Sequence, residues 1–157
     1  MNRIVENCLI VAVLLIIILI PVCLAIRKSR INKKKEIGNE LIKAERQFKT
    51  CFHHIDQLDS FVIAMDQKKK VIFQMDLKDY KSELIDLKDV SNCIVEEKKQ
   101  RNTIQLLQLV LRNSSQQALH HIILYKQYVD NEGRLKNLLK TASQWEVMIN
   151  RAVSLTA

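Results

Sequence analysis

The sequence predicts an α+β protein in which an N-terminal transmembrane helix precedes a small β-domain that a C-terminal amphipathic helix closes. Three observations lead to this prediction: an uncharged apolar run over residues 8–26, short β-branched and aromatic runs over residues 61–126, and helical apolar periodicity over residues 135–152. The 157 residues leave room for one folded domain beside an anchor. An all-α bundle is the alternative.

The apolar run over residues 8–26 reads CLIVAVLLIIILIPVCLAI. A helix rises about 1.5 Å per residue, so this run would span ~28 Å, close to the ~30 Å hydrocarbon thickness of a bilayer. The apolar region of a signal peptide is shorter, about 7–15 residues. The residues before Cys23 lack the small side chain that lipidation requires. We therefore expect residues 1–7 to form a short extracytoplasmic N-terminus and residues 8–26 to form a transmembrane helix.

A dense basic run follows the apolar segment and supplies six of the eight net positive charges of the chain. It consists of Arg27, Lys28, Arg30, Lys33, Lys34 and Lys35. Because basic flanks stay on the cytoplasmic side, we expect a single-pass protein of the cell inner membrane, with its N-terminus out and its C-terminal domain in the cytoplasm. The run would contact anionic headgroups of the lipid bilayer, with each basic side chain contributing about 1 kcal/mol. Since the basic character is local, we expect no nucleic-acid partner.

Apolar residues recur at three- and four-residue intervals after the basic run. They are Leu41, Ala44, Phe48, Cys51, Phe52 and Ile55. This spacing is typical of one face of a helix. We therefore expect residues 27–58 to form a basic juxtamembrane segment and a helical stalk, which leads into a folded domain over residues 59–157.

Short apolar runs separated by polar turns predict the strands of this domain. The runs cover residues 61–65, 70–75, 84–87 and 93–95. Residues 66–69 and 76–79 would form turns.

Residues 103–112 and 118–126 flank the polar residues 113–115, an arrangement typical of a β-hairpin. However, Ile104, Leu107 and Leu111 also have helical spacing. The chain has two glycines and one proline, whereas β-rich domains use both residues in turns. We favour the hairpin, and a helix over this segment is the alternative that would lead to an all-α bundle.

The last segment has the clearest helical periodicity. Its apolar positions are Leu135, Leu138, Leu139, Ala142, Trp145, Met148, Ile149 and Ala152. They repeat at i, i+3, i+4 and i+7, and Asp130 or Asn131 can cap the helix. We expect an amphipathic helix that closes over a sheet, with Trp145 in the core rather than exposed as an interaction anchor.

Residues 61–153 resemble small uncharacterised bacterial membrane-anchored proteins with a pleckstrin-homology-like (PH-like) cytoplasmic domain. The segments that carry the likeness are FVIAMDQKKKVIFQMD, a two-strand opening with an Asp-led turn; ELIDLKDVSNCIVEE, a strand and acidic ledge; and TASQWEVMINRAV, the closing helix with its Trp. The resemblance covers about 60% of the chain. It implies a PH-like fold and a membrane setting. It implies no activity, because such domains serve as lipid-binding, protein-binding or structural modules.

Two histidine doublets are the candidate metal ligands. They are His53-His54 and His120-His121. Adjacent histidines point apart, so a site would need one from each doublet and an acid such as Asp56 or Asp59. The spacing of His53 and Asp56 would place two ligand types on one helical face. No HExxH motif and no cysteine cluster accompanies them, so we expect no metal site.

Catalytic motifs are missing from the sequence. No Gly-rich phosphate loop occurs, and Ser114-Ser115 lies outside a nucleophile elbow. The acids between residues 76 and 97 alternate with lysines, which is typical of a solvated surface. We therefore expect no enzyme, no catalytic residue and no cofactor.

The sequence favours a non-catalytic single-pass membrane protein whose cytoplasmic domain interacts with an unknown protein partner or with lipid. Homo-oligomerisation is left open. A helical self-associating membrane scaffold is the first alternative, and metal-dependent activity through the His pairs is the second.

Overall fold

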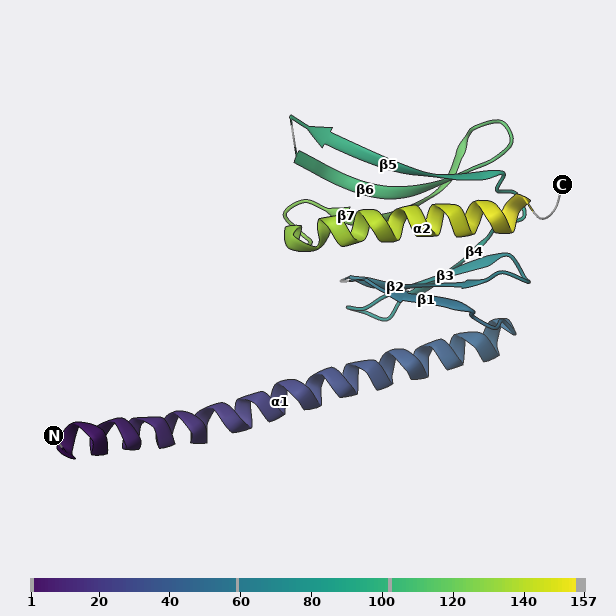
Figure 1. Ribbon diagram of the computed structural model, residues 1–157. Coiled ribbons are helices and arrows are strands. Elements are labelled where there is room, and N and C mark those ends of the chain that lie inside the picture. The colour runs from purple at the N-terminus through teal and green to yellow at the C-terminus, as the bar shows by residue number, and fades with distance from the viewer. Residues whose placement is uncertain (1, 59, 102, 155–157) are drawn as a thin grey trace. The chain divides into compact units, whose positions relative to one another are not determined.

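The computed structural model describes the backbone of residues 2–58, 60–101 and 103–154, and the side chains of residues 17–28, 34–58, 60–101 and 103–154. The chain divides into two units, residues 1–48 and 49–157. The first is a single helix. The second holds two antiparallel sheets and a C-terminal helix (Figure 1). This confirms the predicted α+β class.

The first unit is one continuous helix, α1 (Asn2–Phe48), with Pro21 inside it. Helical backbone therefore covers the predicted span over residues 8–26, but the side chains of residues 1–16 lie outside the described residues. Among the residues that the structure describes, no helix combines the length and the apolar character needed to cross a membrane. The membrane span stays a prediction.

The helix ends earlier than the apolar stripe predicts. We expected helix as far as Ile55, whereas α1 ends at Phe48 and β1 (His54–Gln57) follows. Lys49 adopts a left-handed φ of 52°, a conformation that terminates helices. Ile55 pairs with Ala64 of the next strand. Its spacing from Phe48 therefore belongs to a strand and not to a helical face.

The described residues of the second unit contain seven strands in two antiparallel sheets. Sheet A has the order β1-β2-β3-β4 and sheet B the order β5-β6-β7. After β1 the strands are β2 (Phe61–Asp66), β3 (Val71–Asp76), β4 (Ser82–Asp86), β5 (Asn92–Gln100), β6 (Thr103–Arg112) and β7 (Ala118–Lys126). The predicted strands are confirmed, including both strands of the hairpin around residues 113–115. The helical alternative for residues 103–126, and with it the all-α bundle, is wrong.

The turns are formed by non-glycine residues with positive φ angles and by aspartates whose side chains accept backbone hydrogen bonds. Within the described chain, left-handed φ values occur at Lys49, Lys70, Tyr80, Arg101, Gln116 and Tyr128. At the end of β2, Asp66 Oδ1 accepts the backbone N–H groups of Lys68 and Lys69 at 2.9 and 3.0 Å. Such side-chain bonds turn the chain as a glycine would. The scarcity of glycine is therefore no argument against a sheet.

The inner faces of the two sheets and the C-terminal helix α2 (Leu135–Ser154) share one core. A short 3₁₀ turn, η1 (Glu132–Arg134), leads into α2, and Asn131 caps that turn. The buried residues of α2 are Leu138, Ala142, Trp145, Ile149 and Ala152. This confirms the amphipathic pattern and the core position of Trp145. Figure 1 shows α2 running alongside β5, β6 and β7.

Candidate functional site

The sheet order places β1, β4, β5 and β7 at sheet edges. An edge strand carries backbone N–H and C=O groups that no neighbouring strand satisfies. The side chains of α2 contact two of these edges, β5 and β1. They form hydrogen bonds with the backbone of β5, but with a side chain of β1.

The edge of β5 is closed by polar side chains of α2. Asn150 accepts a hydrogen bond from the Cys93 amide at 2.7 Å and donates one to the Cys93 carbonyl at 2.8 Å. Glu146 accepts the Val95 amide at 3.1 Å. These bonds occupy the amide and carbonyl of Cys93 and the amide of Val95, with which a strand added along the first half of β5 would pair.

The thiol of Cys93 is buried in the shared core. Burial, and secondarily the charge of Glu146, raises the pKa of Cys93 to about 12. A neutral thiol is a poor nucleophile. Cys93 is therefore a structural residue of the β5–α2 contact.

The edge of β1 is not closed in this way. The Leu58 amide donates to the Phe61 carbonyl at 2.9 Å, which sets the register of the β1–β2 hairpin. Because bonded pairs alternate along an antiparallel ladder, the backbone groups of Asp56 and His54 face β2, whereas those of Ile55 and Gln57 point away from it. Within the described chain, β1 pairs with β2 alone. His54, Ile55 and Gln57 are exposed.

An open groove of about 620 Å³ lies between β1 and α2. It is lined by His54 and Asp56 from β1 and by Lys140, Ser143, Gln144, Val147 and Met148 from α2. Val147 is 61% exposed although it is apolar. We call this surface the β1–α2 groove.

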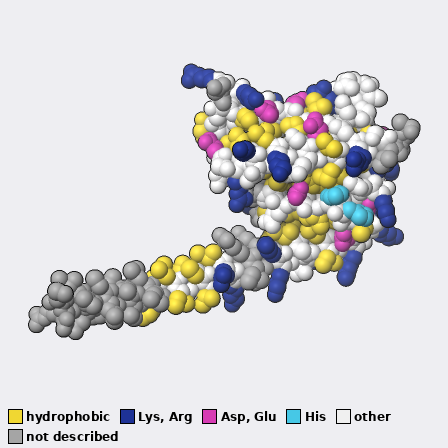
Figure 2. Space-filling view, in the orientation of Figure 1, with side chains coloured by type: hydrophobic (Ala, Val, Ile, Leu, Met, Phe, Trp, Pro, Cys, Tyr) yellow, Lys and Arg dark blue, Asp and Glu magenta, His cyan; other side chains and the backbone are white. Residues whose placement is uncertain are grey.

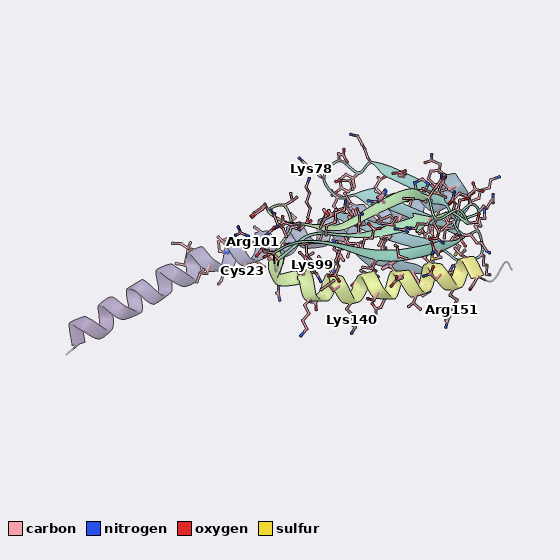
Figure 3. All side chains as sticks on the ribbon, turned by 90° about the horizontal axis from the view of Figure 1, so that it is seen from above. Cys23, Lys78, Lys99, Arg101, Lys140 and Arg151 are labelled. Atoms are coloured by element: carbon pink, nitrogen blue, oxygen red, sulfur yellow. The ribbon has the colours of Figure 1, made fainter. Side chains whose placement is uncertain are left out.

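The wall of the groove is held by one partly buried hydrogen bond. The indole Nε1 of Trp145 donates to Asp56 Oδ2 at 2.7 Å. The carboxylate of Asp56 is thereby engaged, whereas Lys140 forms no ion pair with any described residue. Figure 3 shows Lys140 on α2. The groove therefore offers an available positive charge beside an exposed apolar side chain.

A second hollow of about 390 Å³ lies at the other end of α2, between the β2–β3 turn and the segment after β4. Its two basic residues are Lys70 and Lys88. Lys88 pairs with Asp86 at 3.2 Å, and Lys70 has its own interaction partner. Lys88 is therefore already paired with an acid, and neither lysine of this hollow is a free cation.

Opposite charges alternate over the second unit, as the sequence predicts. Lys81 pairs with Asp79 at 2.9 Å, and Lys99 pairs with Glu97 at 2.6 Å. Figure 2 shows basic and acidic side chains scattered over the visible face, without a patch of one sign.

No protein-family model, curated protein or solved structure matches this chain. The functional proposal therefore depends on the fold and on the β1–α2 groove.

The two histidine doublets belong to separate parts of the second unit, and His53 lies just before β1. His54 begins β1, and His120 and His121 belong to β7. The expectation that His53 and Asp56 share a helical face is wrong, because this segment leads into a strand. Among the described residues, no group of three or more His, Cys, Asp or Glu side chains is placed to hold a metal ion. Asp59 lies outside the described residues.

Four of the predicted membrane-contact residues are exposed on α1, namely Arg27, Lys28, Lys34 and Lys35. The side chains of Arg30 and Lys33 lie outside the described residues. Arg27 and Lys34 are seven residues apart, as are Lys28 and Lys35, and seven residues correspond to about two helical turns. The four basic residues therefore form two neighbouring rows on one side of α1. Their contact with lipid headgroups stays a prediction.

Sequence reasoning missed the closure of β5 and the β1–α2 groove. One signal was present, because Glu146 and Asn150 are four residues apart and adjoin the apolar stripe of α2. Polar residues at this spacing share a helix face and can satisfy one strand edge together. The sequence carries no comparable signal for Asp56.

Proposed function

We propose that this chain is a non-catalytic single-pass membrane protein that presents a PH-like domain to a protein partner. The β1–α2 groove carries this proposal, because it combines an exposed apolar residue, an available cation and a strand edge without a described neighbour. Exposed apolar surface beside unpaired backbone is typical of interaction sites.

The layout of the second unit supports the PH-like assignment. The resemblance of residues 61–153 implies several short strands followed by one C-terminal amphipathic helix, and the described strands of the two antiparallel sheets with α2 after them agree with that layout. The assignment concerns the fold alone, since PH-like domains serve several kinds of ligand.

The absence of catalysis is supported by the polar groups of the groove. Asp56 is hydrogen-bonded to the Trp145 indole, and Ser143 Oγ donates to the Leu139 carbonyl at 3.2 Å. A serine nucleophile is activated by a hydrogen bond to a base such as histidine, and an acid that orients such a base is bonded to it. The partners of Ser143 and Asp56 in these two hydrogen bonds are Leu139 and Trp145, and neither is a histidine. Binding is therefore the function that these side chains favour.

The membrane anchor is supported by the uncharged run over residues 8–26 and by the basic rows after it. The positive flank favours an external N-terminus and a domain on the cytoplasmic side of the cell inner membrane, with the basic run on anionic headgroups. A reporter enzyme fused after Ala157 tests this topology. We expect activity in the cytoplasmic form of the reporter and retention of the full chain in alkali-washed membranes. Activity outside the cytoplasm alone would contradict the orientation.

Site-directed photo-crosslinking tests the protein partner. A photoreactive amino acid in place of Val147, in the full chain and in native membranes, should yield one discrete adduct with another protein. The matched control replaces Lys126, which is exposed at the end of β7 and lies outside the groove. Adducts of equal pattern from both positions, or none from Val147, would refute a partner in the groove.

A further inference from the structure

We propose that the β1–α2 groove binds an extended peptide segment that adds to sheet A as a further strand beside β1. The peptide places an apolar side chain on Val147 and Met148 and a carboxylate on Lys140. This inference deepens the function proposed above and rests on it, because it names the form in which the protein partner is bound.

The backbone of β1 supplies the first part of the recognition. The N–H and C=O groups of Ile55 and Gln57 point away from β2, as the register of the hairpin requires. Two outward residues separated by one inward residue match the repeat of an added strand. The peptide main chain can therefore pair with β1 without a rearrangement of sheet A.

The contrast with β5 favours β1 as the receiving edge. Asn150 and Glu146 already bond the amides of Cys93 and Val95, so a peptide along the first half of β5, beside α2, would have to displace them. At β1 the side chain of Asp56 is bonded to Trp145 instead, and this bond leaves the outward backbone groups untouched. The bond also holds β1 beside α2 before a ligand arrives, which lowers the ordering cost of binding.

The side chains of the groove set the sequence pattern of the peptide. Alternate residues of an added strand lie on the same side of sheet A as His54 and Asp56, and so face α2. There they meet Val147, which is 61% exposed, and Lys140, which has no ion-pair partner among the described residues. The matching ligand carries an apolar residue and an acidic residue.

The spacing of the two peptide residues follows from helix and strand geometry. Lys140 and Val147 are about 10.5 Å apart along the axis of α2, at roughly 1.5 Å per residue. Strand residues that share a face are ~6.7 Å apart, and the next such pair is ~13 Å apart. With the reach of the lysine side chain, the acid belongs two or four positions from the apolar residue.

A synthetic peptide with this pattern tests the proposal. The probe is Thr-Ile-Thr-Ile-Thr-Glu-Thr with blocked ends and a fluorophore, titrated with the full chain in lipid nanodiscs. Fluorescence anisotropy should show saturable binding. Hydrogen exchange should slow at the amides of Ile55 and Gln57 and stay unchanged at Cys93 and Val95. Protection at the β5 amides instead, or no saturable binding, would overturn the proposal.

Paired variants separate strand addition from other modes of binding. Gln57→Pro removes an outward N–H while the β1–β2 ladder is kept, and should weaken binding about tenfold or more, whereas Gln57→Ala should stay within about twofold. Circular dichroism of both variants verifies that the sheets are intact. Equal affinities for the two variants would exclude pairing with β1.

Charge reversal tests the assigned role of Lys140. Lys140→Glu should weaken binding of the probe about five- to tenfold. A second probe with Lys in place of Glu should bind the Lys140→Glu variant about as tightly as the original probe binds the unchanged chain. Arg151→Glu makes the same charge change on α2 outside the groove, and should alter neither affinity. Figure 3 labels both residues. A failure of the exchanged pair to recover would refute the contact with Lys140.

Two results distinguish this inference from the broader function. If the photo-crosslink at Val147 forms but the peptide does not bind, a partner is present and strand addition is wrong. If the amides of Ile55 and Gln57 become protected with rising protein concentration and without peptide, a second copy of this chain occupies the edge and the peptide assignment is wrong.

Discussion

The indole of Trp145 donates a 2.7 Å hydrogen bond to the carboxylate of Asp56, which lies 89 residues earlier in the chain. Trp145 is fully buried, and Asp56 belongs to the edge strand β1. This bond joins the C-terminal helix to the first strand of sheet A. It therefore helps to hold α2 on the core and fixes one wall of the β1–α2 groove.

Removal of the indole donor should cost more than neutralisation of its acceptor. Trp145→Phe leaves the Asp56 carboxylate without its partner and should lower the free energy of unfolding by about 2–4 kcal/mol, including the lost indole volume. Asp56→Asn keeps an acceptor oxygen and should cost about 1 kcal/mol. Urea unfolding followed by far-UV circular dichroism measures both. Equal losses would mean that the hydrogen bond contributes little.

The closure of β5 depends on the side chain of Asn150. Asn150→Ala removes both bonds to Cys93 and should cost about 1–3 kcal/mol, because the strand amide and carbonyl lose their partners. Hydrogen exchange at the Cys93 amide should accelerate. The matched control is Asn137→Ala, an exposed position of α2 where the higher helix propensity of alanine should add a few tenths of a kcal/mol. A similar effect at both positions would refute the capping role.

Asp66 should make the stability of the fold depend on acid pH. Burial by itself raises the pKa of Asp66. Hydrogen bonds from the backbone amides of Cys51, Lys69 and Lys68, together with the charge of His53, lower the pKa by more, so that it lies below its usual value. A depressed pKa stabilises the folded state above the unfolded value of about 3.9, and this contribution is lost as the pH falls through the lower folded value.

The substitution Asp66→Asn isolates this effect. It places an amide N–H₂ near the donor N–H of Cys51, which now bonds Asp66 Oδ2 at 2.9 Å. The loss should be about 1–3 kcal/mol at neutral pH. It should shrink as the pH falls below about 4, where the carboxyl of the unfolded chain takes up its proton before that of the folded protein does. Denaturant unfolding at pH 7, 5 and 3 measures the difference. A constant difference across this series would contradict the assigned pKa direction.

The turn between β6 and β7 should gain stability from glycine. The amide of Gln116 donates to the Asn113 carbonyl at 3.0 Å, and Gln116 has a φ of 62°. A left-handed residue after such a turn favours glycine, because a Cβ is strained there. Gln116→Gly should raise the free energy of unfolding by about 0.5–1 kcal/mol. Ser115→Gly, at a position without positive φ, should lower it, and thermal unfolding compares the two.

Most strands and the C-terminal helix follow from local sequence. The runs that become β2 and β3 are β-branched and aromatic, and the apolar spacing of α2 repeats over five buried positions from Leu138 to Ala152. Such patterns indicate which face of a segment is buried, and they can be recognised without knowing which other segments pack against it. The hairpin of β6 and β7 was also predicted with its observed bounds, because two long apolar runs flank a polar turn.

The β1–α2 groove was not predicted from the sequence, because it is formed by two segments, β1 and α2, that are far apart in the chain and come together only in the folded domain. The four residues of β1 are too few and too polar for a period of two to be recognised, and their spacing from Phe48 imitates a helix. Their strand conformation arises from pairing with β2. Likewise, the closure of β5 by Asn150 requires residues 57 positions apart to come together.

The sequence by itself determined the amphipathic helix and the local character of the positive charge, and it favoured the strand runs and the α+β class over an all-α bundle. Each of these depends on residues within one or two turns of one another. The tertiary structure alone decided which sheet edge α2 closes and which it leaves open. That decision depends on hydrogen bonds between distant segments, Trp145 with Asp56 and Asn150 with Cys93. The spacing of polar residues on α2 can indicate that they share a face, but it does not say which strand they bond.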